Sequence, residues 1–175
     1  MNPKRILVGV AILAASGGVT AQSPVPIFRG PVTESALVNA LTPEPRFRSI
    51  VPVPNAPPPK PAAASLLITF ETNSASLTQR SKSTLDVVGR ALNTDQLREF
   101  RFRIEGHADP RGSHQHNFVL SQARAESVRD YLVSSQDVEG ARLVPEGKGD
   151  REPLNRENIA APENRRVTIV NLGGS

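Results

Sequence analysis

The sequence predicts an α+β fold, a two-layer sandwich in which helices cover one face of a mixed β-sheet. From about residue 64 onward, apolar residues recur first with the period of a strand and then with that of a helix. This alternation occurs twice and is followed by two further strands, which gives the order βαβαββ. The predicted strands alternate apolar with polar side chains, so one face of the sheet is expected to contact water. About 110 residues suffice to bury such a core.

The first 21 residues show the pattern of a secretory signal peptide. A basic pair at residues 4–5 precedes an apolar run over 6–15 and three small residues at 19–21. The apolar run is shorter than the ~20 residues that a membrane helix needs. We therefore predict export of the chain, cleavage after Ala21 and a mature chain without a transmembrane segment. An anchor that stays uncleaved is the alternative.

Residues 22–63 are predicted to form a proline-rich tether. Half of the chain's 16 prolines lie between Thr42 and Ala63, and this density favours extended polyproline geometry over a packed core. The exception is a short helix over 34–41, for which Thr33 is a suitable cap. So short a helix is marginal in isolation. It is therefore either frayed or docked, and an envelope protein is one predicted docking partner.

The elements of the domain, predicted over residues 64–175, follow from the spacing of apolar residues. Leu85, Val88 and Leu92 recur at helical spacing, whereas the apolar residues within 100–104 alternate with arginines. In order, the sequence predicts a strand at 66–71, a helix at 78–93, a strand at 100–105, a helix at 121–134 that Ser121 caps, and strands at 143–144 and 167–170.

Composition argues against several function classes. Residues 64–175 hold equal numbers of basic and acidic residues, so the formal net charge of +4 comes entirely from residues 1–63. A nucleic-acid-binding domain concentrates positive charge on its folded face, so nucleic acid is not an expected partner. The chain contains no cysteine, which leaves no thiolate for a zinc site, for a disulfide or for a lipid anchor.

An acid and an arginine stand out as a candidate site. Arg124 shares the apolar helix face of Leu120 and Val128, and a charge directed toward a core needs a partner. Asp109, in the loop after the strand at 100–105, is the nearest candidate. One interpretation is a structural salt bridge. The other is a cleft that binds a zwitterion, in which the carboxylate takes an ammonium group and the guanidinium takes a carboxylate.

Neighbouring residues extend this candidate site. Asn117 offers an amide that both donates and accepts hydrogen bonds, and the turn at Gly112 brings backbone N–H groups near the start of a helix, where anions are favoured. No nucleophile paired with a base is evident, so the pattern favours binding over catalysis.

Several motifs in a fixed order resemble the OmpA-like family over residues 66–172. They are GHADPRG at 106–112, followed by Asn117, Leu120-Ser121 and Arg124-Ala125, then Gly147-Lys148-Gly149, Pro153 and Asn164-Arg165-Arg166-Val167. The resemblance implies non-covalent, non-enzymatic binding of peptidoglycan in the periplasm without a cofactor. It also implies that the ligand is the diaminopimelate residue of the stem peptide, and that the protein links the wall to the outer envelope.

The resemblance also assigns roles to residues. It implies that Asp109 holds the ammonium group of diaminopimelate and that Arg124 holds its carboxylate. Asn117 and the backbone of Arg111 and Gly112 are expected to line the same pocket. Ala108 stands where many members carry Thr, although peptidoglycan-associated lipoproteins share the alanine. A further pair, Arg165 and Arg166, is expected to brace the last strand rather than to end the floor of the cleft.

Two alternatives to peptidoglycan binding remain. The first is a structural or protein-interaction module that has the fold but no ligand. The second is a metal-dependent hydrolase built on His107, Asp109, His114 and His116. A single carboxylate in a turn rich in proline and glycine disfavours that metal site. Any association with the outer membrane is expected to come through a partner protein that contacts the tether.

Overall fold

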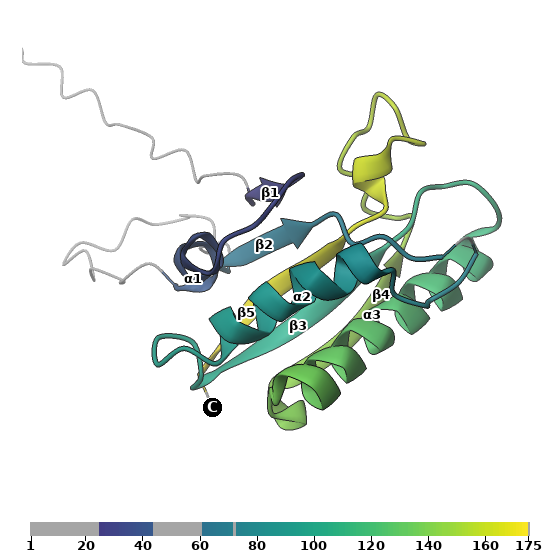
Figure 1. The fold of residues 1–175 in the computed structure, drawn as a ribbon. Coiled ribbons are helices and arrows are strands. Elements are labelled where there is room, and N and C mark those ends of the chain that lie inside the picture. The colour runs from purple at the N-terminus through teal and green to yellow at the C-terminus, as the bar shows by residue number, and fades with distance from the viewer. Residues whose placement is uncertain (1–24, 44–60, 72, 175) are drawn as a thin grey trace, which may run out of the picture.

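The computed structural model describes residues 25–43, 61–71 and 73–174 (Figure 1). The predicted signal peptide and residues 44–60 of the tether lie outside them. The elements in chain order are β1 (Ile27–Phe28), α1 (Glu34–Leu41), β2 (Ala63–Leu66), α2 (Gln79–Leu92), β3 (Phe100–His107), α3 (His114–Gln136), the 3₁₀ turn η1 (Gly140–Arg142), β4 (Leu143–Gly149), the 3₁₀ turn η2 (Pro162–Asn164) and β5 (Val167–Gly174).

The strands form a five-stranded sheet in the order β1-β2-β5-β3-β4. The central strand, β5, pairs antiparallel with β2 and β3, whereas β1 joins β2 and β4 joins β3 in parallel (Figure 1). The sheet is therefore mixed, as predicted. Gly106 near the end of β3 lies opposite Val167 at the start of β5, and His107 lies beside Gly149 of β4. Three strand ends thus meet where the chain enters the Asp109 loop.

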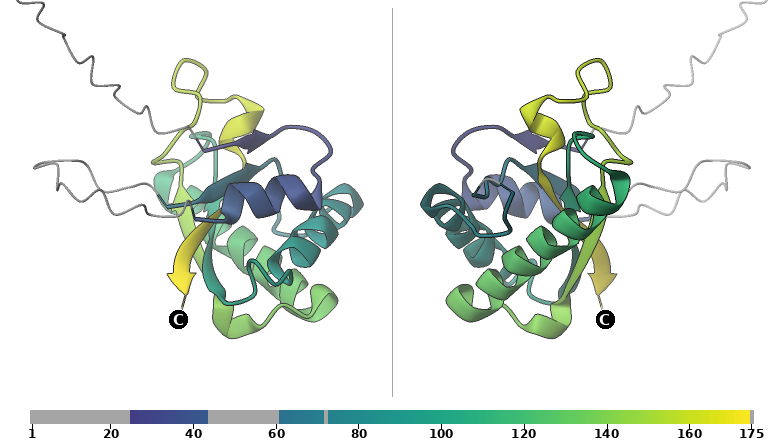
Figure 2. Two further views of the ribbon diagram at one scale, coloured as in Figure 1. Left: turned by 90° about the vertical axis from the view of Figure 1, so that its left-hand side faces the viewer. Right: turned by 90° about the vertical axis from the view of Figure 1, so that its right-hand side faces the viewer.

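The helices cover one face of this sheet, which confirms the predicted two-layer arrangement (Figure 2). Phe102 and Ile104 of β3 and Ile169 of β5 are fully buried, as are Leu85 of α2 and Leu132 of α3. The alternate residues of β3 and β5 face away from the helices. The apolar residues that recur with helical and with strand spacing in the sequence therefore pack into a single core.

Helix α1 packs on the domain, although the sequence assigns it to the tether. The Thr33 side chain caps it as predicted. Leu37, Val38 and Leu41 are buried in the common core, and the Asn171 side chain of β5 donates to the Leu41 carbonyl at 2.8 Å. The helix is thus docked rather than frayed. Its apolar face packs within this chain and not against a partner protein.

The boundaries of the strands differ from the predicted ones. The strand predicted at 66–71 is wrong, because β2 ends at Leu66, where the chain turns and the Ile68 N–H donates to the Leu66 carbonyl at 3.0 Å. Beyond this turn, Phe70 forms only an isolated bridge with Leu77. The last two strands are longer than predicted and end at glycines, because backbone pairing with β3 continues past their apolar residues.

Helix α3 begins earlier than predicted. Its cap is Ser113 rather than Ser121, because the Ser113 Oγ accepts the backbone N–H of His116 at 3.2 Å. Ser121 lies inside the helix, and its Oγ accepts the N–H of Gly149 at 2.9 Å. The additional turns of α3 connect directly to the Asp109 loop.

Two glycines allow α3 to approach the sheet closely. A Cβ atom at Gly106 would overlap the backbone carbonyl of Ser121, and one at Gly147 would lie 2.6 Å from the backbone nitrogen of Gln122. Neither position has space for a side chain, so the helix packs against bare backbone of β3 and β4. This contact fixes the turn of α3 that carries Arg124.

Candidate binding site

The Asp109 loop is anchored by hydrogen bonds at the strand ends. The N–H of His107 donates to the Arg166 carbonyl at 2.9 Å, and the N–H of Ala108 donates to the Gly149 carbonyl at 2.8 Å. Ala108 and Asp109 are both buried. The position of the Asp109 carboxylate is therefore set by both strands that flank β3.

Two arginines bind this carboxylate, and neither is Arg124. Arg111 donates to Oδ1 from its backbone N–H at 3.2 Å and from Nε at 3.0 Å, and to Oδ2 from Nη2 at 2.8 Å. Arg165 donates from Nη1 to Oδ2 at 2.7 Å. Hydrogen bonds from Arg111, followed by that from Arg165, hold the pKa of Asp109 well below its usual value despite burial. The carboxylate is ionised at neutral pH.

The two arginines differ in exposure. The Arg111 side chain is 68% exposed and that of Arg165 is 38% exposed. An ion pair made by a hydrated side chain is weak, so a ligand cation can replace the exposed Arg111 at small cost. Arg165 joins the loop to the residues before β5 and also lines the cavity beside Arg124, so it combines the predicted bracing contact with the alternative place in the cleft.

Arg124 is held by the connection between β2 and α2. Its Nε donates to the Ser74 carbonyl at 3.1 Å, and its guanidinium carbon lies 4.9 Å from the centroid of the Phe70 ring. The structural salt bridge between Asp109 and Arg124 is not formed. Burial, and then Arg165, lower the pKa of Arg124, whereas Asp109 raises it. The two charges are thus neighbours without a direct bond.

Arg124 and Arg165 line a common cavity of about 210 Å³. Within the described part of the chain, neither Nη of Arg124 donates a hydrogen bond, so these groups are available to a ligand. Asp109 lies next to this cavity, bonded to Arg165. The lining residues are Leu67, Ile68, Thr69, Phe70, His107, Arg124, Pro162, Arg165 and Arg166.

Asn117 and Gly112 shape the surroundings and are not among the lining residues. The Asn117 Nδ2 donates to Asp150 Oδ2 at 3.1 Å, and His114 Nδ1 lies 2.8 Å from the same carboxylate. Burial raises the pKa of Asp150. Hydrogen bonds from His114 and Asn117 outweigh this effect, so the pKa lies below its usual value. Gly112 has φ of +100°, which favours glycine in this turn.

The histidines do not come together as a metal site. His114 contacts Asp150, His116 Nε2 lies 3.1 Å from Asn73 Oδ1, and His107 is buried 3.8 Å from Glu105. Across residues 25–43, 61–71 and 73–174, no group of three or more His, Cys, Asp or Glu side chains is arranged to hold a metal ion. The hydrolase alternative thus lacks its ligand set in this part of the chain.

Sequence reasoning missed the contributions of Phe70 and Ser74. Both lie in the connection between β2 and α2, about 50 residues before Arg124 in the chain. An aromatic ring and a backbone carbonyl at that separation give no periodic signal. Only the packing of α3 beside this connection brings them to Arg124.

Comparison with known proteins places the chain in a family. The OmpA family model matches residues 69–166, which is more than half of the chain. The chain belongs to the OmpA family. It is 32% identical over 109 residues to a peptidoglycan-associated lipoprotein of Mesorhizobium japonicum, covering 62% of this chain and 63% of that protein. It is 35% identical over 132 residues to outer membrane protein A of Bordetella avium, covering 70% of this chain and 66% of that protein.

A solved structure shows the same OmpA-family fold. The peptidoglycan-associated lipoprotein from Burkholderia pseudomallei superposes with a TM-score of 0.52 at 28% identity, covering 67% of this chain and 95% of that chain. The family match includes the six predicted site residues, together with Phe70 and Arg165. The chain spans slightly less than two thirds of the length of the Mesorhizobium relative. Among the described helices, none has the length and apolar character required to cross a membrane.

Proposed function

We propose that this OmpA-family chain binds cell-wall peptidoglycan non-covalently through the diaminopimelate residue of the stem peptide. The observation that carries the proposal is the Arg124 guanidinium, whose Nη groups are available in a cavity beside the ionised carboxylate of Asp109. A cation and an anion side by side fit the zwitterion at the end of a diaminopimelate side chain. Relatives named as peptidoglycan-associated support this assignment.

Arg124 binds the carboxylate of the ligand. Its Nε hydrogen bond to Ser74 and the Phe70 ring fix the guanidinium plane before a ligand arrives. The remaining edge of the fork donates two parallel hydrogen bonds to a carboxylate. Preorganisation reduces the entropy lost on binding.

Asp109 binds the ammonium group of the ligand. The ammonium takes the place of the exposed Arg111 side chain on the carboxylate, while Arg165 keeps its bond to Oδ2. This exchange retains the charge balance of the buried Asp109. Ala108, Asn117 and Gly112 hold the loop that presents the carboxylate. No turnover follows, because this constellation offers charges and hydrogen bonds rather than an activated nucleophile.

The proposal places this binding in the periplasm. The pattern at residues 1–21 directs export, and the related lipoproteins and outer membrane proteins belong to the cell envelope. The protein would link the wall to the outer envelope, with a partner protein contacting the proline-rich part of its tether.

Co-sedimentation with purified sacculi tests the proposal. The mature chain is expected to pellet with diaminopimelate-type sacculi and not with lysine-type sacculi, because the lysine side chain lacks the second carboxylate. Arg124→Ala is expected to weaken binding by about 30-fold or more, since it removes one member of a desolvated charge pair.

The matched control is Arg129→Ala on the same helix. Arg129 pairs at the surface with Asp130 at 3.1 Å, so this variant removes an arginine without touching the cavity. Circular dichroism checks that each variant is folded. Equal binding by folded Arg124→Ala and Arg129→Ala would show that the site is elsewhere, and no binding by the folded wild type would refute the function.

A further inference from the structure

A second cavity lies on the face of the sheet opposite the helices. It has a volume of about 300 Å³. His107 and Arg166 belong to the linings of both this cavity and the one beside Arg124. These two side chains are therefore the common wall of two adjoining spaces. The lining also includes Ser65, Glu105, Glu152, Leu154, Thr168 and Val170.

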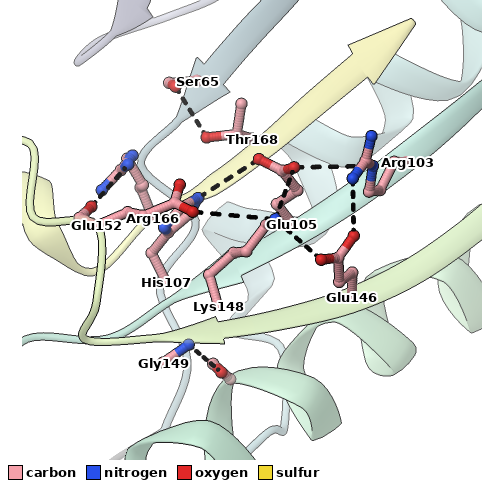
Figure 3. A network of polar contacts seen from close by, with 11 residues as sticks. Ser65, Arg103, Glu105, His107, Glu146, Lys148, Gly149, Glu152, Arg166 and Thr168 are labelled. Carbon is pink, nitrogen blue, oxygen red and sulfur yellow. Dashed lines mark hydrogen bonds and ion pairs between the residues drawn. The ribbon is translucent and has the colours of Figure 1, made fainter. Parts of the chain in front are cut away.

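Arg166 is a buried cation with unused donors. The residue as a whole is only 8% exposed. Nη2 donates to the Glu152 carbonyl at 3.2 Å (Figure 3), whereas Nε and Nη1 are buried without a hydrogen-bond partner. No ion pair joins Arg166 to a carboxylate of the described residues. A buried donor left without an acceptor destabilises the fold, and a charged donor does so most.

The acids nearby are engaged with other cations. Glu105 lies 3.5 Å from Lys148 and 3.7 Å from Arg103, and Glu146 lies 2.8 Å from Lys148 (Figure 3). Burial lowers the pKa of Arg166, whereas Glu152 and Glu105 attract its guanidinium and raise the pKa by less, but neither acid accepts a hydrogen bond from Nε or Nη1. These donors call for an anion from outside the chain.

The rest of the cavity limits the shape of that anion. Ala63, Leu154 and Val170 supply apolar lining. The hydroxyl groups of Ser65 and Thr168 hydrogen-bond to each other at 2.9 Å (Figure 3), which reduces their need for a ligand. A small apolar body that ends in a carboxylate fits both the lining and the guanidinium fork.

We propose that this cavity is a second subsite, in which Arg166 binds a further carboxylate of the same wall peptide. The inference rests on the proposed function, because the shared wall makes the second cavity a continuation of the diaminopimelate site. A stem peptide carries carboxylates besides the diaminopimelate zwitterion, and alanine residues supply small apolar bodies. His107 is buried at the junction, where its Nε2 lies 3.8 Å from Glu105 Oε2 (Figure 3) and neither ring nitrogen makes a hydrogen bond to the described residues.

Calorimetry with three probes tests this subsite on the mature full chain. The probes are free meso-diaminopimelate, a stem peptide with free carboxylates, and the same peptide with every carboxylate outside diaminopimelate amidated. Amidation is expected to weaken binding to the wild type about tenfold, because a charge-assisted hydrogen bond is lost. Arg166→Gln is expected to cause the same loss for the free peptide, with no further loss for the amidated one. Free meso-diaminopimelate lacks the further carboxylate, so its affinity reports what the variant changes in the cavity beside Arg124, which Arg166 also lines. That change is expected to be smaller than the loss for the free peptide.

The matched control is Arg156→Gln, an exposed arginine in the same loop. Unchanged wild-type affinity on amidation overturns the subsite without reference to any variant. An equal loss for all three probes in Arg166→Gln also overturns it, since Arg166 then acts only on the fold. If the wild type binds neither meso-diaminopimelate nor sacculi, the proposed function fails, and the subsite fails with it.

Discussion

The helix-free sheet face and the candidate binding site both collect charged side chains, but they match them differently. On the sheet face, cations and anions alternate along β3 and β4. Arg103 and Lys148 approach Glu146 at 3.0 and 2.8 Å, and both also lie near Glu105 (Figure 3). These four charges have counter-charges within the protein and need no ligand. Arg166 beside them is the exception, because its Nε and Nη1 have no acceptor among the described residues.

At the candidate site, cations exceed anions. Asp109 is shared by Arg111 and Arg165, and Arg124 stands beside them without an acid of its own. A guanidinium that lines a cavity without a carboxylate partner lowers the stability of the folded chain. The comparison teaches that an excess of one charge, rather than the mere presence of charge, distinguishes a binding site from a structural network.

The largest effect is expected from removing Asp109, the acid of the candidate binding site. Asp109→Ala leaves Arg165 without its counter-charge and removes the proposed ammonium contact. We expect a loss of about 2 kcal/mol in the free energy of unfolding, because several hydrogen bonds to a charged group are lost while both arginines stay partly hydrated, together with loss of sacculus binding. Urea denaturation and co-sedimentation measure the two effects. A variant of wild-type stability would contradict the bracing role of Asp109.

The pH dependence of stability also tests the contribution of Asp109. The pKa of Asp109 is lower in the folded state than its value of about 3.9 in an unfolded chain. Its stabilising contribution is therefore present above the unfolded pKa of about 4 and is lost as the pH falls toward the folded pKa. Urea denaturation between neutral and acidic pH should show a shallower decline for Asp109→Asn than for the wild type. Parallel curves would argue against this linkage.

A smaller effect is expected on the helix-free sheet face, where Arg103, Glu105, Glu146 and Lys148 neutralise one another. Glu105→Gln removes an acid that faces Arg103 and Lys148, and a lost charge-assisted contact costs about 1–2 kcal/mol. Affinity for free meso-diaminopimelate should remain that of the wild type, because Glu105 does not line the cavity beside Arg124. If the variant loses diaminopimelate binding while it stays folded, the distinction between the two clusters fails.

The smallest effect is expected for the exposed arginine. Arg111→Ala removes the ion pair of a hydrated side chain, so little loss of stability is expected. Because the proposed ammonium group competes with Arg111 for Asp109, affinity for meso-diaminopimelate should rise a few-fold. Calorimetry measures the change. A marked fall in affinity would mean that Arg111 itself contacts the ligand.

Local sequence patterns predicted much of the fold correctly. The helix predicted at 78–93 is α2, the strand at 100–105 lies within β3, and the helix at 34–41 is α1 with its Thr33 cap. Each of these is encoded by side chains a few residues apart. The end of β2 and the start of α3 were predicted wrongly, because a turn at Leu66 and a polar first helical segment carry no apolar period.

The candidate site was only partly predictable. The sequence drew attention to Asp109 and Arg124, and in the structure Arg124 lines the cavity while Asp109 reaches it through Arg165. Their role as ligand-binding residues stays a prediction. The sequence suggested Asp109 and Arg124 as a pair, whereas the structure joins Asp109 to Arg111 and Arg165. A charge that the sequence places near a core is expected to have a partner. Which residue becomes that partner depends on the strand ends that lie within reach of its side chain in the fold.

The sequence by itself determined the kinds of elements, their order and the presence of an acid and an arginine at neighbouring element ends, because these follow from local periodicity and from the cost of burying charge. The tertiary structure decided the rest. Pairing of β5 between β2 and β3 brought Arg165 to Asp109 and Arg166 to the wall between two cavities. Such contacts join residues that are distant in the chain, and only the packed sheet sets their distances.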